Sequence, residues 1–596
     1  MANKKSGIKE NIKSIRFLWQ YVKTYRWQLV VVAIMIVTST YFQVISPLLL
    51  GDAIDALATY VTSNFAPNGD PTAAFETFTQ AIVFLIGAFV ATSFGMFIQN
   101  FMMSTMAGKA TNAMRIELFK KLESLSIRFF DQSSDGEIQS NFTNDIDNIS
   151  TMMSQSLIQV LSNIALLIGI IIMMIRENIT LALVTLIMGP IVVFLSSIIV
   201  RKAKIYVDAQ QARLSELNGY IDEKISGQKV IISYGLEAET VEGFLTYNEA
   251  LKKTSIKGQI YSGILFPMIQ GISLLNTAMI IFVGSNLAIN GTVTIGLLVA
   301  FVQYSQRFFQ PLSQIASQYN LLQLALTGAN RVSHIFSQQS DVTDQTDAQP
   351  IAKISGAVEL QHVSFGYEPE KPVLKDISMT VKRGQMVALV GPTGSGKTTV
   401  MNLMNRFYDV ESGVITIDGN DIKTYTLESL REKVGIVLQE STIFSGTIRE
   451  NICYGKHDAA QSEVETAAKL ANLHDFIMSL EKGYETEVTN ATSVFSTGQK
   501  QLLSIARTIL TDPDLLILDE ATSNVDTVTE AKIQKAMDNV LHGRTSFVIA
   551  HRLKTILRAD VIIVLRDGEI IERGNHQELM QENGFYAELY HNQFVE

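Results

Sequence analysis

The sequence predicts a protein of two unlike parts, an all-α domain of six membrane-spanning helices with long cytoplasmic extensions, followed by an α/β domain. Long apolar runs fill residues 1 to about 320 and are absent from about residue 355 onward. Beyond that point short β-rich runs alternate with helical ones, as is typical of α/β domains. The chain of 596 residues is 47% hydrophobic and only 18% charged, which indicates a membrane protein.

Charge and cysteine content narrow the possible partners and compartments. The formal net charge is −10 and no basic stretch stands out, so we expect no nucleic-acid partner. Cys453 is the only cysteine, so no intrachain disulfide can form, which suits a reducing cytosol.

Six apolar runs are long enough to cross a bilayer, and we expect each to be a span. They cover about residues 28–50, 79–105, 155–175, 179–200, 260–289 and 294–317. The first run is longer than the apolar region of a signal peptide, so we expect it to stay uncleaved. Before it, apolar residues recur at helical intervals among lysines, which predicts an interfacial elbow helix at about 8–25, with a solvated arm as the alternative.

Loop charges predict how the spans are oriented. The loop between the first two spans contains Asp52, Asp55, Asp70 and Glu76 but no Lys or Arg, whereas the long loops after the second and fourth spans are rich in Lys and Arg. By the positive-inside rule the long loops are cytoplasmic. We therefore expect a multi-pass protein of the cytoplasmic membrane, with both termini and the α/β domain in the cytoplasm.

The domain boundaries follow from the same change of pattern. We assign residues 1–325 to the membrane domain, 326–355 to a linker and 356–596 to the α/β domain. The linker contains the stretch HIFSQQSDVTDQTDAQPIAK, which is polar and aperiodic.

The stretch GPTGSGKTT predicts a phosphate-binding P-loop, because it follows the apolar strand Met386–Val390 and opens a helix. That context argues against a chance glycine-rich turn. In this motif the lysine reaches the β- and γ-phosphates and the first threonine of the pair ligates Mg²⁺. The candidate residues are Gly391, Pro392, Thr393, Gly394, Ser395, Gly396, Lys397, Thr398 and Thr399.

The stretch DLLILDE predicts a buried strand that ends in two carboxylates, Asp519 and Glu520. With a P-loop about 120 residues upstream, we expect Asp519 to hold Mg²⁺ and Glu520 to polarise the attacking water. The alternative is that the acidic pair caps the next helix.

Taken in order, the P-loop, IVLQE, FSTGQKQLLSIARTIL, LLILDEATSNVD and FVIAHRL resemble the ATP-binding-cassette domain of ABC transporters. The six spans ahead of it resemble the exporter branch, so the resemblance covers nearly the whole chain. It implies that ATP and Mg²⁺ are bound and that ATP hydrolysis drives transport. It also implies that Tyr367 stacks on adenine, that Gln439 contacts Mg²⁺ and the attacking water, that His551 contacts the γ-phosphate, and that Asp526 crosses a dimer interface. Taken alone, each of these four would be an ordinary structural residue.

Two cytoplasmic loops resemble the coupling loops of such exporters. The first coupling helix is expected near Gly136–Ser140 and the second near Glu223–Ser233. Plain amphipathic helices would have the same pattern.

The signature FSTGQ departs from the pattern of the family. Thr497 replaces a glycine, while Ser496, Gly498 and Gln499 keep the hydroxyl, the small residue and the amide. Glycine at that position lets the backbone approach a γ-phosphate without a Cβ. Further departures lie just upstream, where two more threonines, Thr489 and Thr492, stand at usual glycine positions.

In this family ATP lies between the P-loop of one chain and the signature of another, so a chain with one of each must dimerise. Neutral drift could explain one substitution. The set resembles bacterial heterodimeric multidrug exporters, in which one of two ATP sites is degenerate. The resemblance implies that Lys397, Gln439, Asp519, Glu520 and His551 work with an intact signature on a non-identical partner, while FSTGQ covers the partner's ATP.

The spans contain no Asp or Glu, which argues against proton-coupled transport. Their amides, aromatics and methionines suit a loosely specified apolar ligand. Arg307, in the last span, either snorkels to the interface or faces a cavity. The first interpretation is an exporter of hydrophobic or amphipathic drugs or lipids; the alternatives are a dedicated lipid or peptide exporter and an ATP-gated channel or regulatory subunit.

Overall fold

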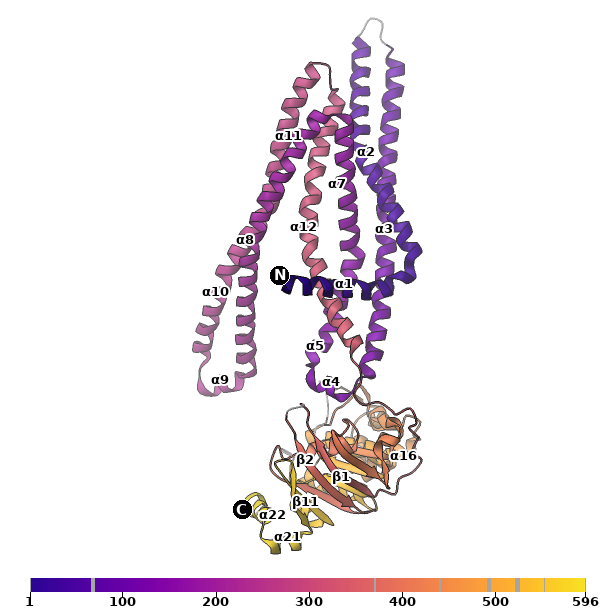
Figure 1. Cartoon of the computed structure of the whole chain (residues 1–596), viewed down its shortest axis with the longest axis vertical. Helices are drawn as coiled ribbons and strands as arrows, with labels where there is room; N and C mark the ends of the chain where they lie inside the picture. The colour runs from indigo at the N-terminus through magenta and orange to yellow at the C-terminus, as the bar shows by residue number, and fades with distance from the viewer. Residues whose placement is uncertain are drawn as a thin grey trace. The chain divides into compact units, whose positions relative to one another are not determined.

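The computed structural model describes residues 2–65, 70–368, 371–438, 441–489, 495–519, 526–550 and 553–594. It divides the chain into two compact units (Figure 1). The helical unit comprises Met1–Glu123 and Asp135–Gln338, and the cassette unit comprises Ser124–Ser134 and Gln339–Glu596. A short segment of the N-terminal half therefore belongs to the C-terminal domain.

The helical unit consists of long helices with short connections, and π-helical turns flank α6. Its helices are α1 (Ala2–Val22), α2 (Arg26–Phe65), α3 (Pro71–Glu123), α5 (Asp135–Ser140), α6 (Ile146–Thr151), α7 (Leu157–Glu177), α8 (Ile179–Ser226), α9 (Gln228–Tyr234), α10 (Glu237–Gly263), α11 (Leu265–Ile289) and α12 (Ile295–Ser337).

Five helical segments of the described chain are long and apolar enough to cross a membrane. They are Ile12–Phe65, Pro71–Glu123, Asp135–Glu177, Ile179–Ser226 and Glu237–Ile289. The sixth expected span, 294–317, is not among them and falls in α12. Four polar side chains, Gln303, Gln306, Arg307 and Gln310, interrupt the apolar sequence there.

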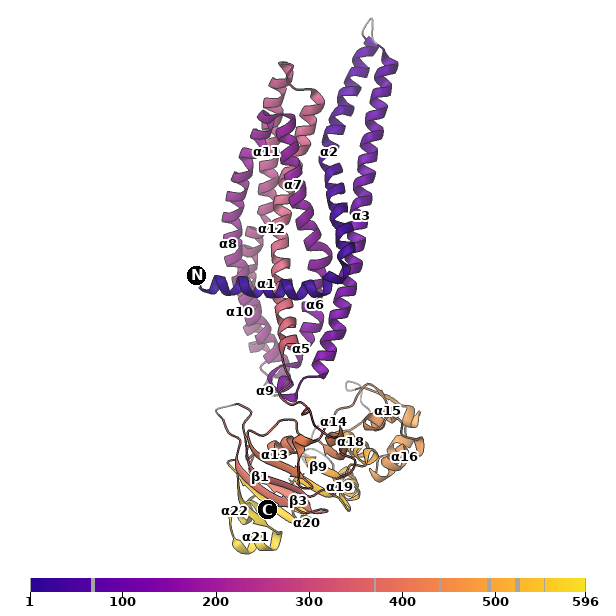
Figure 2. The same cartoon turned by 45° about the vertical axis from the view of Figure 1, so that its right-hand side comes forward.

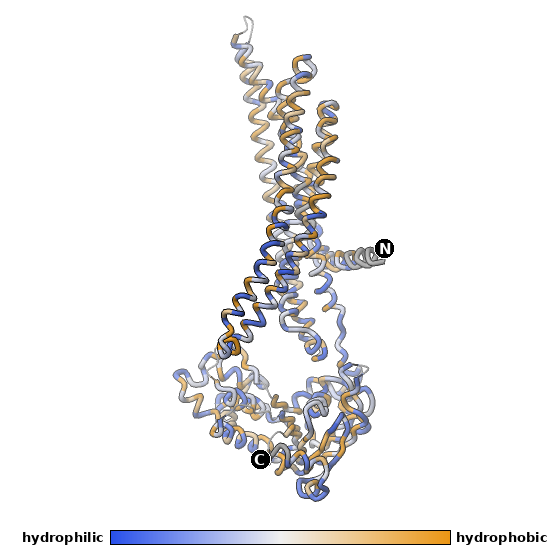
Figure 3. Tube along the Cα trace, turned by 90° about the vertical axis from the view of Figure 1, so that its left-hand side faces the viewer, coloured by the Kyte–Doolittle hydropathy of each residue, from blue (hydrophilic) through white to orange (hydrophobic). Residues whose placement is uncertain are grey.

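The helices are longer than a bilayer is thick. The 48 residues of α8 extend for about 72 Å, whereas a hydrocarbon core measures about 30 Å. α2 lies along α3, and α8 lies along α10 with α9 between them (Figure 1). In Figure 3 apolar residues dominate the part of the unit that contains the expected spans, and the α8 and α10 extensions are more hydrophilic.

α12 organises the helical unit because it packs against α2, α7 and α11. Its buried aromatic residues Phe301, Tyr304, Phe308 and Phe309 share one core with residues of α2, α7, α8 and α11. α12 continues to Ser337, beyond the expected start of the linker at 326, because its apolar periodicity buries further residues. These residues are Ala329, Val332 and Ile335.

The cassette unit contains two main sheets among the described residues (Figure 2). The larger sheet has the order β12 (Glu569–Gly574), β11 (Val561–Arg566), β3 (Met386–Val390), β10 (Thr545–Ile549), β9 (Leu515–Asp519) and β6 (Val434–Val437). Its strands are parallel except β12. The antiparallel sheet has the order β2 (Leu374–Val381), β1 (Val358–Phe365), β4 (Ser412–Ile417) and β5 (Asn420–Asp421), and a separate pair consists of β7 (Gly446–Thr447) and β8 (Glu487–Val488).

Helices cover these sheets and form a second apolar core around α18. They are α13 (Lys397–Met404), α14 (Leu427–Lys433), α15 (Ile448–Ile452), α16 (Gln461–Leu470), α17 (His474–Met478), α18 (Thr497–Thr511), α19 (Thr527–Leu541), α20 (Leu553–Arg558), α21 (His576–Glu582) and α22 (Phe585–Phe594). The mainly apolar strands β3, β9 and β10 are buried because helices cover both faces of a parallel sheet.

A segment just before the expected first coupling helix packs with the cassette. We expected the coupling helix near Gly136–Ser140, and the structure has a helix there, α5 (Asp135–Ser140), in the helical unit. The segment that packs with the cassette is Ser124–Ser134, which contains α4 (Ile127–Gln132). The segment Ser124–Ser134 contacts the cassette through polar and aromatic side chains, so a search for amphipathic helices alone would not find this segment.

A glycine in the antiparallel sheet gives a stability test. Gly413 has φ +84, and a Cβ there would lie 2.3 Å from the His362 carbonyl oxygen. Gly384 has φ +76 and open space around it. We expect Gly384→Ala to cost about 1 kcal/mol through its backbone alone, and Gly413→Ala to cost about 1–3 kcal/mol more because it also displaces backbone. Thermal unfolding of the full-length variants measures the difference, and equal costs would contradict the predicted clash.

Candidate active site

An open pocket of about 580 Å³ lies where β3 ends and α13 begins. A volume of this size falls in the usual range for small-molecule and cofactor sites. The pocket brings an aromatic residue, most of the P-loop and an acidic residue together. Its lining residues are Tyr367, Val373, Thr393, Gly394, Gly396, Lys397, Thr398, Thr399, Asp519 and Ile549.

The P-loop backbone requires glycine at two tightly packed positions. Gly391 has φ +157, and a Cβ there would lie 2.1 Å from the Leu565 carbonyl oxygen. Gly396 has φ +102, and a Cβ there would lie 2.5 Å from Leu374 Cδ2. These glycines let the loop wrap around the start of α13, whose first N–H groups then point at an anion-binding position.

The Lys397 side chain is held over the loop by backbone oxygens. Its Nζ donates to the carbonyl oxygens of Gly391 and Pro392, both at 2.8 Å, and lies 3.4 Å from Ser395 Oγ. Burial lowers the pKa of this ammonium group, and the nearby Asp519 carboxylate opposes that shift. The ammonium group is therefore buried without an ion pair among the described residues, and phosphate oxygens would supply the missing negative charge.

Tyr367 is positioned by α13 and by neighbouring aromatic rings. Its hydroxyl donates to Thr399 Oγ1 at 3.3 Å and accepts from Asn402 Nδ2 at 3.1 Å. Its ring meets those of Phe365 and Tyr408 edge to face, each at 5.1 Å between centroids. The hydroxyl bonds and the edge contacts fix the orientation of the ring at the pocket wall, as a stacking partner for a planar base requires.

Tyr408 links this aromatic group to the segment Ser124–Ser134, a role that we did not predict. Its hydroxyl donates to Asp131 of α4, and the Arg128 guanidinium lies 5.6 Å from its ring centroid. Arg128 also pairs with Asp341 at 2.9 Å. Burial and the hydrogen bond to Asp131 raise the pKa of Tyr408, so its hydroxyl stays protonated as a donor. The sequence feature that could have pointed to this role is the position of Tyr408 in the run RFYDV, just after α13.

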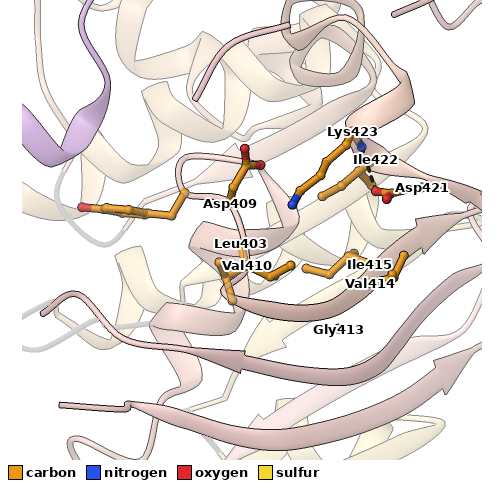
Figure 4. A pocket seen from close by; sticks show the side chains of 10 residues that line it. Leu403, Asp409, Val410, Gly413, Val414, Ile415, Asp421, Ile422 and Lys423 are labelled. Atoms are coloured by element: carbon orange, nitrogen blue, oxygen red, sulfur yellow. Dashed lines mark hydrogen bonds between the residues drawn. The ribbon is translucent and has the colours of Figure 1, made fainter. Parts of the chain in front are cut away.

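A second pocket, beside Tyr408, is too small for a ligand (Figure 4). Val410, Val414 and Ile415 lie along one side of it, and Asp409 and Lys423 lie on the other. Its volume of about 10 Å³ is about that of one water molecule.

Asp519 reaches the pocket through strand register. It is the last residue of β9 and lies opposite Ile549 of β10, which itself pairs with Leu389 of β3. Carboxyl ends of parallel strands meet at one edge of a sheet, so Asp519 and the P-loop that follows β3 share that edge. Three predicted catalytic residues, Gln439, Glu520 and His551, lie outside the described residues.

The signature residues do not line this pocket; they lie at the start of α18. The Ser496 hydroxyl accepts from the Gln499 backbone N–H at 3.3 Å, and the Gln499 side chain accepts from the Ser496 N–H at 2.9 Å. This capping box starts the helix at Thr497, which is exposed, with Gly498 buried behind it. Ser496 and Thr497, at the start of α18, are both exposed.

Asp526 also acts as a helix cap. Its carboxylate accepts from the Thr529 backbone N–H at 2.9 Å, at the start of α19. Hydrogen bonds from Thr529 lower the pKa of Asp526, so it is ionised at neutral pH. The structure gives it a local structural role and leaves it exposed.

Arg507 is a further positioning residue that sequence reasoning missed. It lies on α18 and donates to the Asn451 carbonyl at 2.6 Å and to the Thr442 carbonyl at 2.7 Å. Its guanidinium also lies over the rings of Phe444 and Tyr454. These hydrogen bonds connect the segment just after Gln439, which contains Thr442, to α18, the helix that begins at the signature.

The pocket residues fit a magnesium nucleotide. The glycine cradle and the buried Lys397 ammonium group suit phosphate oxygens. Thr398 and Asp519 offer two hard oxygen ligands, and Mg²⁺ in such sites takes its other ligands from phosphate and water. Within the part of the chain that the structure describes, no group of three acidic, histidine or cysteine side chains could hold a metal ion.

Comparison with known proteins identifies the class. The ABC transporter transmembrane region model matches residues 29–312, and the ABC transporter model matches residues 374–523. The "Uncharacterized ABC transporter ATP-binding protein YfiC" of Bacillus subtilis (strain 168) is 43% identical over 100% of this chain and 96% of that protein. The "Fatty acid ABC transporter ATP-binding/permease protein" of Mycobacterium tuberculosis (strain CDC 1551 / Oshkosh) is 36% identical over 86% of this chain and 81% of that protein.

The structural comparison agrees. The structure described as "a bacterial Atm1-family ABC exporter with ATP bound" matches with a TM-score of 0.76 and 28% identity, over 96% of this chain and 99% of that one. The chain belongs to the ABC transporter family. It is a bacterial exporter half-transporter, and its cassette binds ATP and couples ATP hydrolysis to transport across the membrane.

The buried ammonium group gives a direct test of the pocket. Lys397→Ala removes the cation that the loop carbonyls hold over the phosphate position. We expect the ATP hydrolysis rate of the full-length protein to fall at least about 100-fold. Lys423→Ala, a lysine of the small second pocket, is the matched control and should leave the rate unchanged.

Tyr408 gives a test of communication with the segment Ser124–Ser134. Tyr408→Phe removes the hydroxyl that donates to Asp131 but keeps the ring packed on Tyr367. A hydrogen bond to a charged group contributes about 1.5–3 kcal/mol, so we expect substrate-stimulated ATP hydrolysis to fall roughly tenfold while basal hydrolysis changes little. Tyr484→Phe removes a hydroxyl that contacts His474 instead and serves as control. Unchanged stimulation in Tyr408→Phe would exclude this route.

Proposed function

We propose that the protein exports hydrophobic or amphipathic drugs or lipids from the cytoplasmic membrane as one half of a heterodimer with a non-identical half-transporter. One observation supports the heterodimer proposal above all. The chain combines an intact P-loop pocket with a signature in which Thr497 replaces the first glycine. The Mycobacterium relative, named for fatty acid transport, supports a lipid-like substrate.

In this proposal each residue of the predicted ATP site has one task. Tyr367 stacks on adenine, Lys397 and the P-loop amides bind the phosphates, and Thr398 and Asp519, with Gln439, hold Mg²⁺. The metal would neutralise charge between the phosphates. Glu520 orients and polarises the water that attacks the γ-phosphate, and His551 contacts that phosphate.

The signature acts on the other ATP of the dimer. Thr497 occupies the first helical position of α18 and is exposed, so its branched side chain stands where a partner's γ-phosphate would approach. Ser496, Gly498 and Gln499 keep the remaining contacts, and Asp526 lies at the same interface. ATP at that site binds but turns over slowly, because the helix end cannot close fully on it.

Exposed apolar side chains at the tip formed by α9 support the proposal of a partner chain. α9 and the following turn connect the extensions of α8 and α10. Val230 and Ile232 are each 58% exposed and Tyr234 is 76% exposed. Such apolar side chains at the end of a long hydrophilic extension indicate a protein-docking surface. In the proposed heterodimer this tip docks on the partner's cassette.

We further propose the membrane arrangement that the sequence predicts. The chain crosses the membrane six times, with α12 as the last crossing, and Mg·ATP is bound on the cytoplasmic side. The exposed Trp19 and Trp27 flank the entry to α2, where the membrane interface is expected. Both termini lie in the cytoplasm.

The heterodimer is tested by adding and removing the partner. We expect the purified chain alone to hydrolyse ATP about tenfold or more slowly than the complex with its co-purifying half-transporter. In the chain alone, Thr497→Gly should raise the rate about fivefold, corresponding to about 1 kcal/mol at the barrier. Ser462→Gly, a like change in the exposed first turn of α16, should have no effect. Rapid, substrate-stimulated turnover by the unmodified chain alone would contradict the heterodimer.

A further inference from the structure

Arg307 carries the only formal charge in the six expected spans, because the ranges given above contain no other Asp, Glu, Lys or Arg. A charge at membrane depth costs about 2.5–3.5 kcal/mol even on the most lenient insertion scale, so its presence calls for a physical reason. Snorkelling to the interface would be one such reason.

The structure shows Arg307 fixed to the neighbouring helix. Pro47 lies inside α2 and has no N–H, so the Gln43 carbonyl one turn earlier lacks its helical donor. Arg307 Nη1 donates to this carbonyl at 2.6 Å and lies 3.0 Å from Ser46 Oγ. Tyr304, one turn earlier on α12, donates to the next carbonyl, that of Val44, at 2.7 Å. These contacts bind the guanidinium to α2 and leave it no freedom to snorkel.

The partners of Arg307 are all neutral. Its hydrogen bonds within the described residues come from Nη1 alone, to Gln43 and Ser46, and it forms no ion pair there. The half-buried guanidinium therefore keeps its full positive charge and part of its donor fork. A planar fork of this kind binds carboxylate or phosphate in two-point geometry.

Arg307 lies in a polar stripe along α12. Gln303, Gln306 and Gln310 recur at helical spacing with it, and Gln306 and Gln310 are exposed. The opposite face of α12 is buried in the apolar core, through residues such as Phe301 and Phe308. Exposed amides beside a cation do not face lipid in a membrane protein; they line a water-filled or ligand-filled space.

We propose that Arg307 is the binding site for the acidic headgroup of an amphiphilic substrate, a carboxylate or phosphate attached to an apolar tail. This inference rests on the proposed export function and narrows its substrate class. The headgroup pairs with the free side of the guanidinium, and the amide stripe hydrates it. The tail occupies the adjacent apolar space. Because Pro47 lacks an N–H, the Gln43 carbonyl of α2 is left as the acceptor that holds the arginine in place.

The test compares acidic and neutral forms of one amphiphile. The full-length chain, with the half-transporter that co-purifies with it, is reconstituted in liposomes, and ATP hydrolysis is measured against dodecanoate, methyl dodecanoate, monododecyl phosphate and acetate. We expect the two acidic amphiphiles to stimulate at concentrations about tenfold below the methyl ester, and acetate to have no effect. Stimulation by acetate alone at the same concentration would show that only a free anion binds, and would overturn the proposal.

Three variants test whether Arg307 causes the preference for acidic amphiphiles over the methyl ester. Arg307→Gln should reduce the acid-over-ester preference to about one, and Arg307→Lys should keep part of it. Arg176→Gln, the same change at a 74% exposed arginine at the end of α7, should keep all of it. If Arg307→Gln keeps the tenfold preference, the proposal is wrong. If no amphiphile of either charge is stimulatory or transported, the proposed export function itself fails.

A second measurement uses the unmodified protein, in case Arg307→Gln does not fold. A photoactivatable dodecanoate should label peptides of α2 and α12, and excess dodecanoate, but not its methyl ester, should prevent the labelling. Equal protection by acid and ester, or labelling elsewhere, would contradict a headgroup site at Arg307.

Discussion

The parallel register of β3, β10 and β9 is the constraint on which the active site depends. Ser546–Ile549 of β10 pairs with Met386–Leu389 of β3 and with Leu516–Asp519 of β9. Because the strands are parallel, the P-loop and Asp519 emerge at one edge. The glycines at 391 and 396 then turn the chain back into α13 where a Cβ would collide with neighbours. Lys397, Thr398 and Tyr367 come together because that turn is fixed.

The same edge is connected to the N-terminal half of the chain. Tyr408 follows α13, contacts the ring of Tyr367 and reaches Asp131 in the segment Ser124–Ser134. One aromatic pair thus touches both the expected adenine position and the segment that leads from α3 to α5. Arg507 makes a comparable link between the signature helix and the chain after Gln439. Side chains of the pocket wall are therefore in direct contact with side chains that connect distant segments.

Local motifs allowed much of this arrangement to be predicted. The fold class followed from apolar runs and the later alternation, and the P-loop residues and Asp519 follow from strand–loop–helix context. Contacts between distant segments could not be predicted. Asp131 is far from Tyr408 in sequence, and its partner depends on how Ser124–Ser134 packs. The role of Arg307 likewise depends on a carbonyl that Pro47 exposes in another helix. The second, degenerate site remains a proposal because half of it belongs to another chain.

The central claim is that this chain provides the one fully competent ATP site of a two-chain transporter. Vanadate trapping with a photoreactive ATP analogue tests it most directly, in the complex purified from membranes through this chain. The account predicts one trapped nucleotide per complex, cross-linked to this chain's P-loop pocket. Two trapped nucleotides per complex, or a trapped complex that contains two copies of this chain and no other, would contradict it.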